Sequence, residues 1–223
     1  MQKLLIINAK GGCGKTTIAT NLASYYAAHG KETALLDYDP QGSSLVWLQQ
    51  RPNHLPPIYG VDAQQQSHSA TRSWLLKVPP STERIIIDTP ACLKGHELTQ
   101  YLRGVNSVII PVLPSVIDTH ATNRFIDEIL QISKINHRPI SIYLIANRVN
   151  PRTKSFQALN NFIAERKIPL LAYLRDTVNY THASDLGVGI HELPHKKADR
   201  DRTVWTALSQ RLEEPPHQVN ITA

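Results

Sequence analysis

The stretch that most constrains the fold is AKGGCGKTTI at residues 9–18, which directly follows the apolar run LLIIN. Glycines allow a loop backbone to approach an anion closely, and the N–H groups that open the next helix point at it. A strand, a glycine-rich turn and a helix in this order are typical of a phosphate-binding loop in an α/β protein.

The rest of the chain alternates short apolar runs with helix-like segments. The runs RIIID, SVIIPV and SIYLIAN are almost continuously apolar, as expected of strands that are covered on both faces. This alternation predicts an α/β fold, a doubly wound, mostly parallel sheet with helices on both faces, and ligands at the carboxyl ends of its strands. We expect strands at 3–8, 33–37, 84–88, 107–112, 141–147 and 168–174, and helices at 16–29, 41–50, 69–77, 117–134, 153–166 and 199–212.

A chain of 223 residues suits one α/β domain, which we place at 1–213, with a loose Pro-containing tail at 214–223. Because the first strand starts at residue 3, we expect no helix-turn-helix domain before it. We also expect no secretory leader and no membrane span. The two cysteines, Cys13 and Cys92, fit a reducing cytoplasm, and we expect Cys92 to be a small core residue.

The phosphate loop assigns roles to its own residues. Lys15 is expected to contact the β- and γ-phosphates of a nucleotide, and the Thr16 hydroxyl is expected to help hold Mg²⁺. The predicted nucleotide-binding residues in this loop are Gly11, Gly12, Cys13, Gly14, Lys15, Thr16 and Thr17.

The loop departs from the usual pattern at two positions. The first glycine of that pattern falls on Ala9, and Lys10 adds a charge beside the glycines. In this, the chain resembles the deviant Walker-A ATPases of the ParA/MinD superfamily, which have the P-loop NTPase fold. The resemblance implies that Lys10 reaches across a dimer interface to the partner's nucleotide, where a cation offsets the charge that develops in phosphoryl transfer. The alternative is a solvated lysine on the loop rim.

Two aspartates close the second expected strand, in LLDYDPQG, which resembles the family's switch I. The resemblance implies that Asp39 orients or activates the attacking water near Mg²⁺ and that Asp37 supports the metal site. Alternatively, both acids cap the next helix. Asp88 ends the apolar strand RIIID, resembles a Walker-B aspartate, and is expected to accept hydrogen bonds from Mg²⁺-bound water.

Further residues and segments of interest lie outside the phosphate loop and the aspartate motifs. In the family an asparagine at the position of Asn147 contacts the adenine edge, although an asparagine that ends a strand can equally satisfy turn backbone. The segment 174–192 resembles the family's late segment near the adenine. Trp47, after switch I, is expected in the core or at the dimer face.

A formal net charge of +6 is compatible with simple solubility or with a polyanion partner. The resemblance favours non-specific DNA, held by phosphate contacts. The acids Asp199 and Asp201 partly neutralise the densest basic cluster. The candidate DNA-binding residues are Arg175, Lys196, Lys197, Arg200 and Arg202, with Arg152 and Lys154 as further candidates.

Together these features predict a slow ATPase that uses ATP and Mg²⁺, dimerises when ATP-bound and then binds DNA. A cargo-adaptor protein stimulates hydrolysis, so that a plasmid, a chromosome region or a protein cargo is segregated or positioned. The location expected is the cytoplasm, on the nucleoid in the ATP state.

Three other functional classes, which we call branches, share this fold and phosphate loop. A MinD-like membrane ATPase needs a C-terminal amphipathic helix, which the polar, proline-containing end disfavours. A metabolic ATPase of the amidotransferase or biotin-pathway type does not generally combine Lys10 with the switch I pattern. An iron–sulfur reductase needs two cluster cysteines from each subunit, whereas one of the two cysteines here lies inside the phosphate loop.

Overall fold

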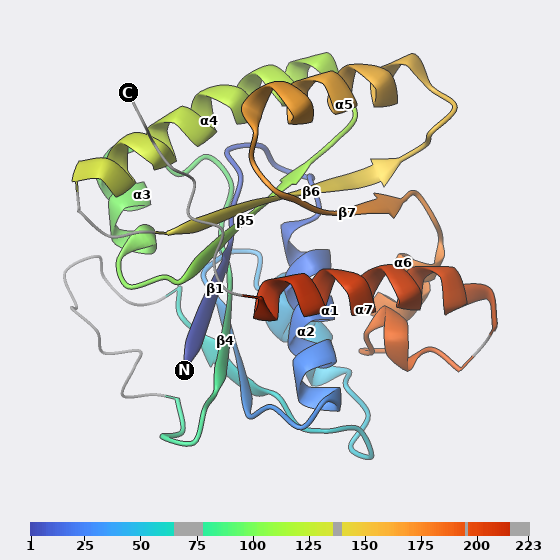
Figure 1. The fold of residues 1–223 in the computed structure, drawn as a ribbon. Coiled ribbons are helices and arrows are strands. Elements are labelled where there is room, and N and C mark those ends of the chain that lie inside the picture. The colour runs from blue at the N-terminus through green and yellow to red at the C-terminus, as the bar shows by residue number, and fades with distance from the viewer. Residues whose placement is uncertain (65–77, 136–139, 195, 215–223) are drawn as a thin grey trace.

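The computed structural model describes residues 1–64, 78–135, 140–194 and 196–214. The helix expected at 69–77 and residues 215–223 of the expected tail lie outside these ranges. All the pairings in the sheet are parallel, in the strand order β3-β2-β4-β1-β5-β6-β7 (Figure 1). The strands are β1 (Gln2–Ile6), β2 (Thr33–Asp37), β3 (Tyr59–Asp62), β4 (Arg84–Asp88), β5 (Ser107–Val112), β6 (Ser141–Val149) and β7 (Leu170–Arg175).

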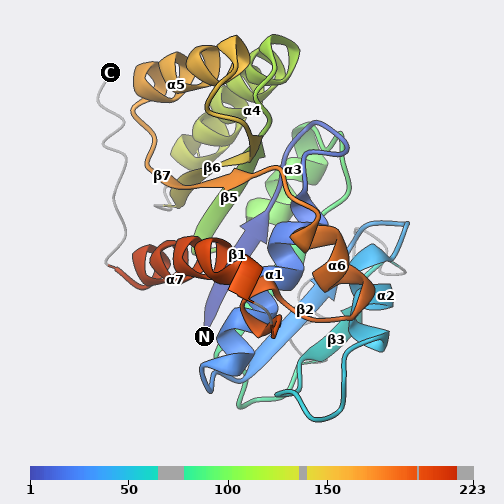
Figure 2. The same ribbon diagram turned by 90° about the vertical axis from the view of Figure 1, so that its right-hand side faces the viewer.

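Helices cover both faces of the sheet, as the apolar runs predict (Figures 1 and 2). The α-helices are α1 (Lys15–Ala28), α2 (Ser43–Gln49), α3 (Gly95–Leu102), α4 (Val116–Ile135), α5 (Lys154–Arg166), α6 (Asn179–Asp185) and α7 (Asp199–Glu213), with short 3₁₀ turns at Ile190–Glu192 and Lys196–Ala198. No helix among the described residues combines the length and the apolar character needed to cross a membrane.

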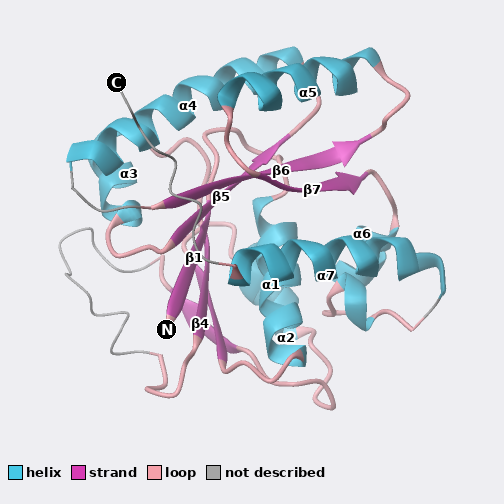
Figure 3. Cartoon of the chain, viewed as in Figure 1, coloured by secondary structure: helices cyan, strands magenta, loops and turns pink. Residues whose placement is uncertain are grey.

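Alternate side chains of each strand enter two separate cores. Leu4 and Ile6 of β1 pack with residues of α1 and α7, whereas Leu5 and Ile7 pack with residues of α3, α4 and α5. This is why the central strands carry no polar face. Figure 3 shows the strands as one layer between the two sets of helices.

Three elements are absent from the sequence-based expectation. β3 is an edge strand with three of its four residues exposed, so it lacks an apolar run, and α3 and α6 are only eight and seven residues long. Trp47 lies in the core, where its indole Nε1 donates a hydrogen bond to the Val188 carbonyl over 3.4 Å.

The expectation that Cys92 is a core residue is wrong. Its side chain is exposed, and its backbone has a φ of 65°. The chain turns sharply after β4 to bring the Cys92 N–H onto the Ala9 carbonyl at 3.0 Å, and this left-handed turn directs the thiol outward.

Candidate nucleotide site

The phosphate loop joins β1 to α1 at the carboxyl edge of the sheet. Gly12 and Gly14 have φ angles of 73° and 97°, a region that favours glycine, and α1 begins at Lys15 directly after Gly14. A Cβ on Gly14 would fall 2.1 Å from Nδ2 of Asn147. The loop therefore has the open N–H groups and the close packing that a phosphate cradle needs.

The two lysines of the loop lie in different surroundings. Lys15 is buried, and its Nζ donates a hydrogen bond to the Lys10 carbonyl over 3.4 Å, so its side chain curls back along the loop. The Lys10 side chain is 43% exposed and its Nζ lies 3.2 Å from Oδ1 of Asp118, at the start of α4. Asn8 accepts a hydrogen bond from the Lys10 N–H, which fixes the backbone at that point.

Asp88 is a fully buried carboxylate at the end of β4, in register with Asp37 of β2 and Ile6 of β1. Neither of its oxygens makes a well-formed hydrogen bond to any described residue. Burial raises the pKa of Asp88 to about 7, and the neighbouring Thr16 hydroxyl and Lys15 partly offset that rise. A buried acceptor without a partner is costly, and a cation or cation-bound water would satisfy it. The site therefore fits the Mg²⁺ expected beside a nucleotide.

The switch I aspartates have backbone partners. Asp37 is buried, and its carboxylate accepts hydrogen bonds from the N–H groups of Asp39, Ser44 and Leu45, which caps the start of α2. Asp39 accepts from the Gln41 N–H through Oδ1. The capping role that the sequence left open is therefore present, and it also fixes switch I beside the phosphate loop.

Within the described ranges, no three His, Cys, Asp or Glu side chains gather closely enough to hold a metal ion by themselves. The set Thr16, Asp37, Asp39 and Asp88 therefore needs phosphate oxygens or water to complete a coordination shell.

Asn147 lies against the phosphate loop. Its Nδ2 donates to the Cys13 carbonyl at 2.8 Å, and its Oδ1 accepts from the Arg148 N–H at 3.0 Å. The structure thus gives Asn147 the backbone-satisfying role, and contact with adenine stays a prediction.

The candidate DNA-binding residues divide by their ion pairs. Arg175 donates from Nε and Nη2 to Asp201 at 2.7 and 2.8 Å, and Arg202 pairs with Asp199 at 2.5 Å, as the sequence suggested for these acids. Lys196, Lys197 and Arg200 are exposed around the start of α7, together with Arg152 and Lys154 at the start of α5.

Two residues of interest were missed by sequence reasoning. Asp118 pairs with Lys10, and Arg148 follows Asn147 with a φ of 51°. A signal existed for Asp118, because it is an acid in the first turn of the helix that follows β5, at the carboxyl edge where ligands bind. No sequence pattern marks the left-handed backbone at Arg148.

Comparisons with known proteins agree with this geometry. Residues 4–188 match the family described as the CobQ/CobB/MinD/ParA nucleotide binding domain. The maintenance of carboxysome distribution protein A of Halothiobacillus neapolitanus is 28% identical over 216 residues, which cover 95% of this chain and 94% of the relative.

Two solved structures show the same fold. The ATP complex of an aspartate-to-alanine variant of McdA from Cyanothece superposes with a TM-score of 0.71 at 16% identity, over 95% of this chain and 96% of that one. A plasmid partition protein from Borrelia burgdorferi bound to AMPPNP gives a TM-score of 0.74 at 15% identity, over 95% of this chain and 99% of that one. The chain belongs to the CobQ/CobB/MinD/ParA nucleotide-binding family and is a P-loop ATPase of the ParA/MinD type.

Proposed function

We propose that the chain is a positioning ATPase that dimerises on ATP, binds DNA non-specifically in that state and so distributes a cargo. The observation that carries this proposal is the separation of the two loop lysines: Lys15 is buried along its own loop, whereas Lys10 stands outside it with a side chain that is 43% exposed. One lysine is thus available to its own nucleotide and the other to a neighbouring molecule.

Within one monomer, the N–H groups of residues 11–17 cradle the phosphates and Lys15 neutralises their charge. Thr16 and Asp88 would hold Mg²⁺, with Asp37 and Asp39 in support, and the bound ion supplies charge neutralisation on the phosphate oxygens. Asp39, in switch I, orients the attacking water.

Two ATP-bound monomers then close face to face. Each Lys10 leaves Asp118 and approaches the phosphates held by its partner, so the transition state is stabilised only in the dimer. Intrinsic hydrolysis is slow for that reason, and a cargo-adaptor protein accelerates it.

The closed dimer presents its basic residues to the phosphates of DNA and so associates with the nucleoid. Lys196, Lys197 and Arg200 are the exposed residues assigned to this contact, whereas the other two candidates, Arg175 and Arg202, are held in ion pairs by Asp201 and Asp199. The long match to a carboxysome distribution protein supports a protein body as the cargo, with a plasmid or a chromosome region as the other possibility.

The experiment follows dimerisation and DNA binding together. Light scattering and retention on random-sequence duplex DNA are measured with ATP, with ADP and without nucleotide, for the wild type and for Asp39→Ala. We expect an ATP-dependent dimer that alone retains DNA, and a variant that accumulates this dimer because hydrolysis is blocked. An Asp39→Ala protein that stays monomeric in excess ATP would refute the switch I assignment.

The same preparation separates the other branches. Flotation with anionic lipid vesicles in ATP is expected to leave the protein in the dense fraction. Robust ATP-dependent flotation without DNA retention would replace this proposal with the MinD-like branch. ATP hydrolysis whose rate does not depend on dimerisation would favour a metabolic ATPase.

A further inference from the structure

Asn147 and Arg148 lie in a β-bulge that interrupts the pairing of β6 with β7. The register of this pairing shifts between Ala146↔Tyr173 and Val149↔Arg175. Arg148, inside this bulge, has a φ of 51°, a left-handed conformation that is uncommon and strained for a residue with a side chain. Such strain persists only where the surroundings impose it, and it points to a function for the bulge.

One side of the bulge is fixed to the phosphate loop. Asn147 donates to the Cys13 carbonyl at 2.8 Å, is 6% exposed, and packs so tightly on Gly14 that a Cβ there would lie 2.1 Å from its Nδ2. Any movement of the loop at Cys13–Gly14 must therefore displace Asn147 as well.

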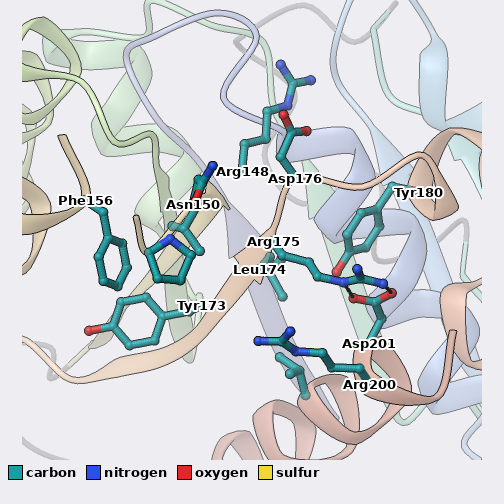
Figure 4. Close-up of a pocket in the computed structure, with 13 residues that line it drawn as sticks. Arg148, Asn150, Phe156, Tyr173, Leu174, Arg175, Asp176, Tyr180, Arg200 and Asp201 are labelled. Atoms are coloured by element: carbon teal, nitrogen blue, oxygen red, sulfur yellow. Dashed lines mark hydrogen bonds and ion pairs between the residues drawn. The ribbon is translucent and has the colours of Figure 1, made fainter. Parts of the chain in front are cut away.

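The other side of the bulge borders a surface pocket of about 600 Å³ (Figure 4). Its walls come from the end of β6 and the loop after it, from β7, and from the beginnings of α5, α6 and α7. In Figure 4 the guanidinium of Arg200 extends from α7 across the pocket, whereas Arg148 stands at the opposite rim beside Asp176. The rings of Phe156 and Tyr173, 5.5 Å apart, form an apolar wall.

The charges of the pocket are not equivalent. Arg175 donates two hydrogen bonds to Asp201, whose carboxylate also accepts from Asn179 at 2.9 Å. The Arg175 charge is therefore neutralised within the chain, and its side chain stabilises the pocket wall. Arg148 and Arg200 are exposed and have no such ion pair among the described residues. They are the two cations of the pocket that can meet a ligand.

We propose that this pocket seats the phosphodiester backbone of DNA between Arg148 and Arg200, and that the Asn147–Arg148 bulge transmits the state of the phosphate loop to it. This inference rests on the proposed function and adds a contact residue and a route of control. A guanidinium fork suits phosphate oxygens, and an apolar wall can pack against a deoxyribose of the duplex without demanding a sequence.

The coupling follows from adjacency in one strained turn. Asn147 bonds to both the Cys13 carbonyl and the Arg148 N–H, so the loop and the Arg148 backbone share one side chain as their link. When nucleotide phosphates rearrange the loop, the link carries the change to the pocket rim. Asp176 at that rim repels phosphate, so the position of Arg148 decides whether the backbone is accepted.

The test compares Arg148→Ala with Arg103→Ala. Arg103 follows α3 and precedes β5, so this control removes the same charge at the amino-terminal ends of the strands, away from the pocket. Affinity for random-sequence duplex is measured at several salt concentrations with saturating ATP analogue. Nucleotide affinity and thermal melting are recorded separately. We expect Arg148→Ala to weaken binding about tenfold, the order of one charged hydrogen bond, and to lower the salt slope by about one. Arg103→Ala should match the wild type.

A double-mutant cycle tests the coupling. If Asn147 acts through Arg148, Asn147→Ala weakens DNA binding in the wild type but not in an Arg148→Ala background. Additive losses overturn the coupling, and equal affinities for Arg148→Ala and Arg103→Ala overturn the site. A wild type that hydrolyses ATP yet never retains DNA refutes the proposed function itself. Should Arg148→Ala not fold, Arg148→Lys decides, with weaker affinity expected at an unchanged salt slope.

Discussion

Nζ of Lys10 lies 3.2 Å from Oδ1 of Asp118, whose side chain is only 10% exposed, so the extra lysine of the phosphate loop is paired within its own chain. A lysine that serves a second molecule must first give up this contact. In the proposed dimer, the ion pair would therefore oppose association by the free energy that it contributes to the monomer, and Asp118 would hold Lys10 until the second subunit binds.

Asp118→Asn should strengthen ATP-dependent dimerisation, because it removes the charge that retains Lys10. The pair is partly exposed, so its worth is about 1 kcal/mol, which corresponds to a roughly fivefold tighter dimer. Sedimentation in ATP measures this. Asp127→Asn, further along α4, breaks an ion pair with Arg166 of α5; it is the matched control and should leave the dimer unchanged. An unchanged dimer dissociation constant in Asp118→Asn would show that the ion pair does not oppose dimerisation.

Lys10→Ala should lose hydrolysis by a factor of about 100 or more while monomers still bind ATP, because only the transition state needs the second cation. Mixing supplies the decisive measurement. A heterodimer of Lys10→Ala with Asp39→Ala has one site that combines its own Asp39 with the partner's Lys10. We expect the mixture to hydrolyse ATP although each variant alone does not. If Lys10 acts within its own chain, mixing restores nothing.

Part of the fold and of the site can be predicted from the sequence. The apolar runs predict β1, β2, β4, β5 and β6 because strands covered on both faces leave a continuous signature, and Lys15 and Asp88 follow from their places after such strands. Side-chain direction is harder. Cys92 was predicted as buried from its residue type, and only the left-handed turn after β4 explains its exposure. The sequence marks Asp118 as an acid in the first turn of α4, but its pairing with Lys10 depends on how α4 lies against the phosphate loop, which no spacing in the chain encodes.

Glu192→Gln should destabilise the fold by about 3 kcal/mol or more, because it breaks a buried pair and strands the other charge. Arg51 donates from Nη1 and Nη2 to Glu192 at 2.9 and 2.7 Å, both side chains are 5% exposed, and the same carboxylate accepts from the Gly189 N–H. Urea unfolding measures the loss. Glu83→Gln, at the exposed pair with Lys31, should change stability far less. Equal small effects would mean that Arg51 finds another partner.

His191 should make the fold less stable in mild acid. Burial lowers its pKa from 6.5 to about 4, against the opposing pull of Glu192, with His29 and Arg51 adding to the decrease. Because the unfolded chain binds the proton more readily, stability is complete above pH 6.5 and falls as the pH drops towards 4, by up to about 3 kcal/mol. Urea unfolding at pH 7, 6 and 5 measures the slope, which His191→Gln should flatten. His120→Gln, at an exposed position of α4, should retain the slope of the wild type. A slope that His191→Gln leaves untouched would assign the acid sensitivity to other groups.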